Sequence, residues 1–386
     1  MPNAHIVKKS LLKTPFKKGD FFYEYLLTSK YDKLIYTKGK DERFFLQLIE
    51  REDSYLVKSD KITRPTNVKI VQDAIKYFIE ANNAEVLNSN IYSDRNRLVE
   101  KSPYQKDIFF YQNFKSDKNV EIEIGFGSGR HILYKAKKYP KKIFIAMEIH
   151  RPSIEQLLKQ CELQGIENIF VIDYDARILL QSLSSNSIDK IYLHFPVPWD
   201  KKPHRRVMSE LFLKETIRVL KKSGELEIRT DSEKYFNYSC KLLNSLDNAT
   251  YLVRKNSFDK GVSSKYEDRW LKMKKDIYEI VFTNQEQSPK REEFEISGFD
   301  KKVKFSEIFK KFENMTIKKE DYFVHFENIY EIDDKKGAIK ISFGSYDRCE
   351  HRYLMFLDEI FYLPSKIVPT KQNFLADKIV KEFIYG

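Results

Sequence analysis

The fold of this chain is constrained most by one stretch, Val120-Glu121-Ile122-Glu123-Ile124-Gly125-Phe126-Gly127-Ser128-Gly129-Arg130. The β-branched residues up to Ile124 predict a strand, and the amphipathic residues 130–138 predict a helix. Glycine allows positive φ angles and lets a ligand approach the backbone closely. A strand joined to a helix by three alternating glycines is therefore typical of a parallel α/β sheet with a ligand at its edge.

The residues around this stretch continue the alternation of strand and helix. Strands are expected at 120–124, 143–147, 169–172, 188–194 and 225–228, and helices at 130–138, 153–164, 209–221 and 232–245. A final pair of strands, 251–254 and 277–283, has no helix between its members. This pattern predicts an α/β domain over residues 116–285, with a parallel sheet covered by helices on both faces.

The flanking residues 1–115 and 286–386 are rich in aromatic and β-branched residues. Strands are expected at 21–26 and 44–49, a helix at 71–81, a polar connection at 84–107 and a closing helix near 371–384. The sequence therefore predicts a β-rich N-terminal extension and a β-rich C-terminal extension. Neither contains a catalytic motif, so no function is predicted for them.

Composition limits the class of protein. The 386 residues suit two or three domains, and no run of about 18 apolar residues that could span a membrane is present. The N-terminal residues lack the apolar core of a secretory signal. The three cysteines, Cys161, Cys240 and Cys349, are far apart, which favours a reducing cytoplasm. No cluster has metal-ligand spacing, so no metal is expected. The net charge of +12 fits either a nucleic-acid partner or a solvated basic surface.

The spacing of the glycines narrows the choice of ligand. A dinucleotide fingerprint would place its third glycine at Arg130, and the GK[ST] of a phosphate loop is absent. A tight turn without a ligand is the alternative. The pattern E-x-G-x-G-x-G resembles the first motif of class I (Rossmann-like) methyltransferases, which implies S-adenosylmethionine as cofactor and Gly125, Gly127 and Gly129 as its loop.

Three carboxylates follow successive predicted strands. Glu123 ends the first strand, where it can lie near the cationic methionine end of the cofactor. Glu148 ends the second strand, 19 residues after Gly129, where an acid can accept from both ribose hydroxyls. Asp175 follows the third strand and can accept from the adenine amino group. One such acid alone would be read as a solvated or capping residue, but three at successive strand ends favour a cofactor site.

A basic loop follows the fourth predicted strand, in His194-Phe195-Pro196-Val197-Pro198-Trp199-Asp200-Lys201-Lys202-Pro203-His204-Arg205-Arg206-Val207. The [DN]PP[YF] motif of adenine and cytosine amino methylation is absent. Cations clustered beside an aromatic ring suit a phosphate backbone with exposed bases. A solvated loop is the alternative, but the neighbouring methyl-donor site favours RNA contacts from Lys201, Lys202, Arg205 and Arg206.

The ordered motifs EIGFGSG, MEIH, DYDA, FPVPWDKKPHRR, IRTDS and SKYE resemble bacterial tRNA (guanine-N7-)-methyltransferases over roughly residues 115–285. The resemblance implies methyl transfer to N7 of the guanine at tRNA position 46. It also implies that Glu123, Glu148 and Asp175 bind the cofactor, that Lys201 and Asp231 bind the substrate, and that Ser264 and Glu267 belong to a late substrate motif in which serine replaces threonine.

Val197 departs from the resembled family, which usually has aspartate at this position. Another acid could compensate, catalysis could tolerate the loss, or the chain could be silent. Guanine N7 has an in-plane lone pair and no proton, so its attack needs no general base and positioning can supply much of the rate. We therefore favour tolerance, with Asp231 as the catalytic carboxylate that stabilises positive charge on the guanine. A silent tRNA-binding relative and a methyltransferase for another RNA base are the alternatives. A cytoplasmic monomer is expected.

Overall fold

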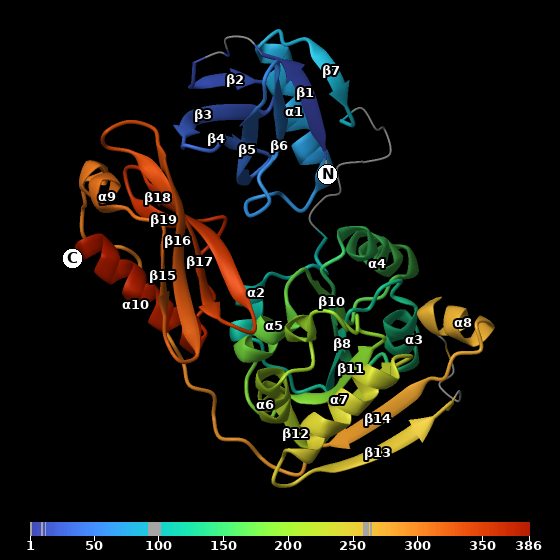
Figure 1. The fold of residues 1–386 in the computed structure, drawn as a ribbon. Coiled ribbons are helices and arrows are strands. Elements are labelled where there is room, and N and C mark those ends of the chain that lie inside the picture. The colour runs from blue at the N-terminus through green and yellow to red at the C-terminus, as the bar shows by residue number, and fades with distance from the viewer. Residues whose placement is uncertain (1, 9–10, 12, 92–101, 258–261, 263–264) are drawn as a thin grey trace. The chain divides into compact units, whose positions relative to one another are not determined.

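The computed structural model describes residues 2–8, 11, 13–91, 102–257, 262 and 265–386. The chain forms two compact units (Figure 1). Unit 1 is made of Met1–Glu100 and Phe294–Gly386, and unit 2 is made of Lys101–Glu293. Where the sequence suggested three consecutive segments, the two flanking segments fold together into one unit, and unit 2 is inserted between them.

Unit 2 contains the expected α/β sheet, in the strand order β10-β9-β8-β11-β12-β14-β13. The first five strands in this order are parallel, and β14 and β13 are antiparallel to their neighbours. The strands are β8 (Val120–Ile124), β9 (Ile143–Met147), β10 (Ile169–Ile172), β11 (Ile188–His194), β12 (Leu220–Thr230), β13 (Thr250–Lys255) and β14 (Tyr278–Thr283). The prediction of a class I methyltransferase sheet is confirmed, including its final pair of strands.

The helices of unit 2 cover both faces of this sheet. Every residue of β8 is buried, and successive side chains of a strand point to opposite faces. The helical segments are α2 (Ile108–Gln112), α3 (Arg130–Lys138), α4 (Arg151–Gln164), α5 (Ala176–Ser182), the 3-10 turn η1 (Pro203–Arg205), α6 (Glu210–Val219), α7 (Glu233–Asn244) and α8 (Lys265–Lys272). Four of these were expected, whereas the short segments α2, α5, η1 and α8 were not.

Unit 1 is built on one antiparallel sheet, in the order β19-β18-β17-β16-β3-β4-β5-β6-β1-β7, with β15 beside β16 and β2 beside β3. Its N-terminal elements are β1 (Asn3–Val7), β2 (Phe16–Lys18), β3 (Phe21–Thr28), β4 (Lys33–Gly39), β5 (Glu42–Glu50), β6 (Ser54–Ser59), α1 (Val68–Ala81) and β7 (Val86–Ser89). Its C-terminal elements are α9 (Phe305–Lys311), β15 (Met315–Lys318), β16 (Tyr322–Glu331), β17 (Gly337–Ser345), β18 (Cys349–Phe356), β19 (Ile360–Leu363) and α10 (Lys371–Tyr385). The expected strands and both expected helices of the flanks are confirmed.

The two halves of unit 1 share an apolar cluster where they meet. Leu27, Leu34, Tyr36 and Phe45 from the N-terminal half pack with Tyr330, Ala338, Tyr353 and Met355 from the C-terminal half. The hydroxyl of Tyr353 also donates a hydrogen bond of 2.9 Å to Asp60 across this junction. Apolar burial, which contributes about 25 cal/mol per Å², therefore holds together strands that are about 300 residues apart in the sequence.

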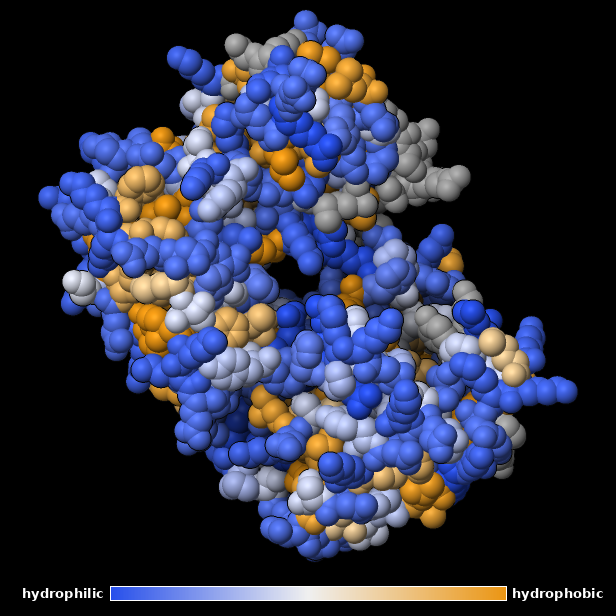
Figure 2. All heavy atoms as spheres, in the orientation of Figure 1, coloured by the Kyte–Doolittle hydropathy of each residue, from blue (hydrophilic) through white to orange (hydrophobic). Residues whose placement is uncertain are grey.

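The face of the molecule drawn in Figure 2 is mostly hydrophilic, and apolar residues occur there in small groups. Among the described residues, no helix combines the length and the apolar character that crossing a bilayer requires.

Candidate active site

The site is positioned by two neighbouring parallel strands, β8 and β11. Ile124 at the end of β8 pairs with Leu193 near the end of β11. The chain leaves β8 through the glycine loop, and it leaves β11 through the basic loop. Ligands of such sheets bind outside the carboxyl ends of the strands, at the point where the strand order reverses. β8 and β11 are that point here, so both predicted motifs lie at one edge of the sheet.

The glycine loop has the backbone geometry that its sequence predicts. Gly125, Gly127 and Gly129 have φ angles of +73°, +53° and +72°. A Cβ at Gly129 would lie 2.9 Å from Leu157 on α4, whereas a Cβ at Gly125 would meet nothing within 4 Å. Gly129 therefore allows α3 to pack closely on α4, and Gly125 leaves open space beside the loop.

Glu148 joins the glycine loop to the end of β9. One carboxylate oxygen accepts a hydrogen bond of 3.1 Å from the Gly127 amide. The other accepts from the amides of Ile149 and His150 at 2.8 and 3.0 Å. A carboxylate that accepts from three backbone amides is held in place, so the position of Glu148 is fixed relative to the loop.

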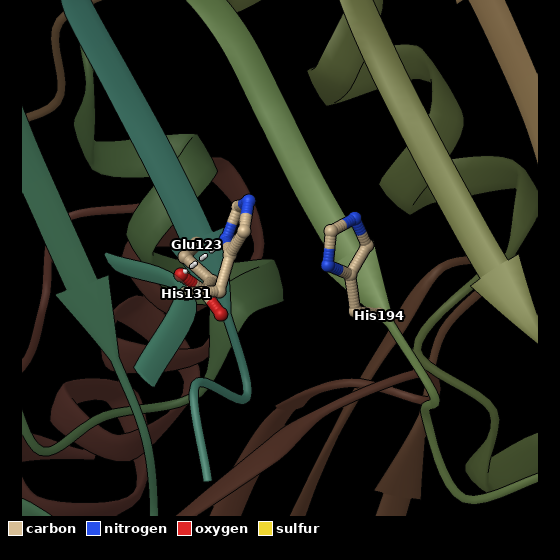
Figure 3. Close-up of side chains that lie close together, drawn as sticks. All are labelled: Glu123, His131 and His194. Carbon is tan, nitrogen blue, oxygen red and sulfur yellow. Dashed lines mark hydrogen bonds and ion pairs between the residues drawn. The ribbon is translucent and has the colours of Figure 1, made fainter. Parts of the chain in front are cut away.

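Glu123 lies at the centre of a small group of ionisable residues. It is 5% exposed and lies 2.9 Å from His131 Nδ1 at the start of α3. The His194 ring faces this pair from the end of β11 (Figure 3), with its centroid 4.9 Å from that of His131. Within the described part of the chain, these three residues form the one group whose potential metal-ligand atoms lie within 4.8 Å of one another. The absence of a metal stays a prediction.

Asp175 caps a helix and pairs with an arginine. Its carboxylate accepts a hydrogen bond of 3.0 Å from the Arg177 amide as the N-cap of α5. It also accepts from Arg177 Nε and Nη2, both at 2.9 Å. The structure thus places Asp175 at the expected strand end, with Arg177 holding its orientation.

The basic loop presents exposed cations beside an aromatic ring. Lys201, Lys202 and Arg205 are exposed, and the Trp199 side chain is 37% exposed. The Arg205 guanidinium lies 5.1 Å from the Trp199 ring centroid. Val197, which stands where the resemblance leads one to expect aspartate, is 61% exposed. The loop therefore offers positive charge and a stacking surface on the same edge as the glycine loop.

Arg206 occupies a different environment from the other cations of the loop. It is 7% exposed, and its Nε donates a hydrogen bond of 2.8 Å to the Pro198 carbonyl. Its guanidinium lies 4.5 Å from the Tyr238 ring centroid on α7. Arg206 therefore fastens the loop to α7, and a contact with substrate would require these interactions to break.

Asp231 lies directly after β12 and has a cationic neighbour. Its Oδ2 is 2.9 Å from Lys275 Nζ, and that ammonium lies 3.7 Å from the Trp270 ring centroid. The Asp231 side chain is 20% exposed. It is thus accessible to a substrate, and its negative charge is partly balanced by Lys275.

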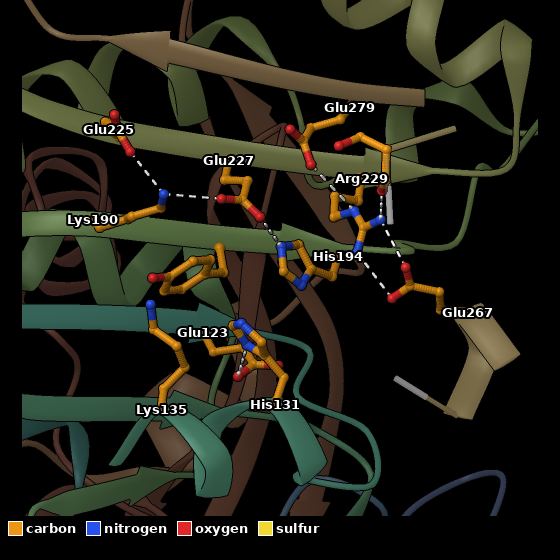
Figure 4. Close-up of polar contacts among 12 residues, drawn as sticks. Glu123, His131, Lys135, Lys190, His194, Glu225, Glu227, Arg229, Glu267 and Glu279 are labelled. Atoms are coloured by element: carbon orange, nitrogen blue, oxygen red, sulfur yellow. Dashed lines mark hydrogen bonds and ion pairs between the residues drawn. The ribbon is translucent and has the colours of Figure 1, made fainter. Parts of the chain in front are cut away.

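Glu267 belongs to a buried ion-pair cluster (Figure 4). Arg229 on β12 donates to both of its carboxylate oxygens, at 2.8 and 2.9 Å. The Arg229 side chain is 2% exposed and also lies 3.5 Å from Glu279 on β14. Glu267 therefore fixes α8 to the sheet. Ser264, the other predicted member of this motif, lies outside the described residues.

A chain of charged residues runs along β11 and β12 to His194 (Figure 4). Lys190 Nζ lies 2.7 Å from Glu225 and 2.9 Å from Glu227, and Glu227 lies 3.1 Å from His194 Nε2. Burial raises the pKa of Glu227, but His194 and Lys190 outweigh it and hold that pKa well below its usual range. Burial lowers the pKa of His194. A neutral His194 therefore donates from Nε2 to the Glu227 carboxylate.

This burial predicts a pH dependence of stability. The lowered pKa of His194 means that, below its ordinary pKa of about 6.5, the unfolded chain binds a proton that the folded protein does not. We expect the free energy of unfolding to fall as the pH drops below this value, by at most about 1.4 kcal/mol per pH unit. Urea unfolding followed by tryptophan fluorescence measures it.

His194→Gln, which keeps a donor for Glu227, should remove this part of the slope. His150 is exposed, so His150→Gln serves as the matched control and should keep the slope. An unchanged slope in His194→Gln would show that other groups cause the pH dependence.

Sequence reasoning missed the charged residues of β11 and β12. Glu225, Glu227 and Arg229 alternate with the buried Leu226 and Ile228. Since successive residues of a strand face opposite sides of the sheet, this alternation already indicates a charged face in an otherwise apolar strand. No sequence pattern indicates that His131 lies near Glu123, because only the packing of α3 brings the two residues together.

The chain is similar in sequence to known methyltransferases. Residues 117–280 match the family described as putative methyltransferases. The tRNA (guanine-N(7)-)-methyltransferase of Campylobacter jejuni (strain 81-176) is 39% identical over all of this chain and 98% of its own length. The Helicobacter pylori (strain 26695) enzyme of the same name is 36% identical over 97% of this chain and 95% of its own. Among solved structures, an rRNA methylase from Streptococcus thermophilus matches 46% of this chain and 94% of its own at 11% identity, with a TM-score of 0.33. The full-length relatives identify the chain as a member of the tRNA (guanine-N(7)-)-methyltransferase family.

Proposed function

We propose that this protein transfers a methyl group from S-adenosylmethionine to N7 of a guanine in tRNA, with position 46 as the target. One observation carries the proposal: the glycine loop after β8 and the basic loop after β11 leave neighbouring strands at the same edge of the sheet. A methyl donor in the first loop would therefore lie beside an RNA base held by the second.

The residues of the glycine loop fit the proposed cofactor. The open space at Gly125 allows a ligand to approach the backbone, and Glu148 is held where its oxygens can accept from ribose hydroxyls. Glu123 supplies negative charge near the loop, and Asp175 completes the set of acids at the strand ends. The sulfonium of bound S-adenosylmethionine supplies the electrophilic methyl group.

The protein's part in the chemistry is to position the guanine and to balance charge. Guanine N7 attacks through its lone pair without losing a proton, so no general base is required. Proximity and orientation can be worth about 7–11 kcal/mol. The methylated ring gains positive charge, which the carboxylate of Asp231 stabilises. An exposed Val197 is compatible with this mechanism, since nothing at that position has to accept a proton.

The basic loop and its neighbours bind the RNA. Lys201 and Arg205 contact phosphates, and the Trp199 ring with Arg205 stacks on an exposed base. Arg206 acts by holding the loop on α7, and Glu267 by holding α8 on the sheet. In this proposal the protein works in the cytoplasm, as a monomer and without a metal.

Val197 motivates the second candidate function. In that case a protein of the same fold binds tRNA and leaves it unmodified.

A nucleoside digest tests the proposed activity. Unmodified tRNA incubated with the protein and S-adenosylmethionine should yield 7-methylguanosine, detected by mass spectrometry. A tRNA with adenosine in place of the guanine at position 46 is the matched control and should yield none. Binding of both cofactor and tRNA without any methylated nucleoside would support the silent relative.

Val197→Asp separates the two candidate functions further. If the valine is tolerated, the aspartate changes the rate by less than about tenfold, because N7 attack needs no base. If the wild-type protein is silent, the variant should produce 7-methylguanosine where the wild type produces none. Single-turnover methyl transfer to the same tRNA measures both outcomes.

A further inference from the structure

A second group of reactive side chains lies in unit 1, outside the candidate active site. Cys349 and His351 lie on β18, and Glu327 lies on β16. The Cys349 sulfur is 3.8 Å from His351 Nε2, and His351 Nδ1 is 3.3 Å from Glu327 Oε1. Lys340 on β17 lies 2.8 Å from the other oxygen of Glu327. A thiol and an imidazole on β18 and a carboxylate on β16 thus form one chain of contacts.

This group faces away from the helix that covers the sheet. Glu350, between Cys349 and His351, points to the opposite side, where Asn373 of α10 donates a hydrogen bond of 2.9 Å to it. Alternation along the strand therefore puts Cys349 and His351 on the face without α10. The His351 side chain is 46% exposed.

Cys349 is half-buried at the edge of this group. Its partner on β17 is Gly344, which has no side chain. On the other side, β19 pairs only with Tyr353–Phe356 among the described residues, so it does not pair with Cys349. The residues paired beside Cys349 therefore leave it partly accessible.

The charges around Cys349 favour a thiolate paired with an imidazolium. The hydrogen bond with His351 lowers the pKa of the Cys349 thiol, and Arg348 acts in the same direction. The hydrogen bonds with Cys349 and Glu327 raise the pKa of His351 to about 9. The charged groups facing this pair are Arg348, Glu327 and Lys340. The positive charge of Lys340 disfavours a protonated His351, but the Glu327 carboxylate pairs with Lys340 and offsets that charge.

The other cysteines of the chain lack these features. Cys161 is buried, and burial raises its thiol pKa to about 11. Cys240 is half-buried, as Cys349 is, but burial raises its pKa. Within the described residues, neither thiol forms a hydrogen bond with a histidine. Since the thiolate is the reactive form, we expect Cys349 to be the most nucleophilic of the three cysteines.

We propose that Cys349 is a modification site at which the thiolate, paired with His351, reacts with hydrogen peroxide. The sulfur attacks one peroxide oxygen, an S–O bond forms and the O–O bond breaks. The sulfur is oxidised by two electrons to a sulfenic acid, and the peroxide is reduced. The leaving hydroxide takes the proton of the His351 imidazolium and departs as water. Both other cysteines belong to unit 2, so unit 1 holds no second thiol for a disulfide within the unit.

Alkylation of the full-length protein by iodoacetamide tests the thiolate. Peptide mass spectrometry at several times should show Cys349 alkylated at least about tenfold faster than Cys240 at neutral pH, because one pKa unit changes the thiolate fraction about tenfold. Because the pKa of Cys349 is lowered and that of Cys240 is raised, the rate at Cys349 should rise less from neutral pH to pH 9 than the rate at Cys240.

His351→Gln keeps a hydrogen-bonding side chain but removes the imidazolium. In this variant the rate at Cys349 should fall about tenfold at neutral pH and recover at high pH. His325 is the matched control, because it aligns with His351 across β17 through Ser342 and bonds to Thr316. His325→Gln should leave the rate unchanged. A rate at Cys349 no faster than that at Cys240, or one unaffected by His351→Gln, would overturn the proposal.

Hydrogen peroxide followed by dimedone tests the reaction itself. Dimedone should label Cys349 in the wild type and label it less in His351→Gln, with no label at Cys161. Rapid alkylation of Cys349 without any dimedone adduct would overturn the peroxide step while leaving the thiolate in place.

Discussion

Replacing Arg229 by methionine should lower the free energy of unfolding of unit 2 by about 3–5 kcal/mol. Arg229 is 2% exposed and lies between Glu267 and Glu279, whose side chains are 5% and 2% exposed. Methionine fills a similar volume without a charge, so the variant leaves two buried carboxylates without their shared cation. Urea unfolding measures the loss, and both tryptophans, Trp199 and Trp270, lie in unit 2 and report on it.

Arg254 offers a matched control for this prediction. It lies 2.8 Å from the same Glu279, but its own side chain is 46% exposed. Exposed ion pairs contribute about 0–1 kcal/mol, so Arg254→Met should destabilise unit 2 far less. Equal losses in the two variants would contradict the argument that burial, rather than the ion pair itself, sets the size of the effect.

Replacing Glu148 by alanine should weaken the binding of S-adenosylmethionine by about 30-fold or more. The reason is twofold: the variant removes the proposed acceptor for the ribose hydroxyls, and it leaves the Gly127 amide without its carboxylate partner. A hydrogen bond to a charged group contributes about 1.5–3 kcal/mol, and 1.4 kcal/mol corresponds to tenfold in affinity. Isothermal titration calorimetry gives the dissociation constant directly.

Two further variants show which role of Glu148 matters. Glu148→Gln keeps an oxygen that can accept from the Gly127 amide, so it should restore most of the affinity if Glu148 only holds the loop. It should stay weak if both carboxylate oxygens bind the ribose. Glu162 on α4 is exposed, and Glu162→Ala, which removes the same charge, should bind as the wild type does. Wild-type affinity in Glu148→Ala would exclude Glu148 from the cofactor site.

The central sheet of unit 2 could be predicted because its signals are local. Val120–Ile124 carries its own strand pattern, and the three glycines that follow can adopt the positive φ angles seen in the structure. Loop and strand order then place the acids at one edge of the sheet. This is why the positions of Glu123, Glu148 and Asp175 at the strand ends could be predicted, whereas their role as cofactor ligands stays a prediction.

The remaining features depend on partners far away in the sequence. Nothing near Arg206 indicates that Tyr238 on α7 covers its guanidinium, although the sequence presents it as one more cation of the loop. Arg229 and Glu267 are 38 residues apart, and only the fold of α8 brings them together. The pairing of Thr28 on β3 with Glu331 on β16 is beyond any local pattern for the same reason.

Because unit 1 is assembled from two distant segments of the chain, it cannot finish folding until late in translation. Leu27, Leu34, Tyr36 and Phe45 are made early, but the residues that cover them, Tyr330 to Met355, are translated only after all of unit 2. Domains generally fold as they emerge, at about 5–20 residues per second. While unit 2 is made, for some tens of seconds, the nascent chain therefore carries an unfinished sheet with exposed apolar side chains. This interval is when the protein would be most exposed to aggregation and most dependent on chaperones.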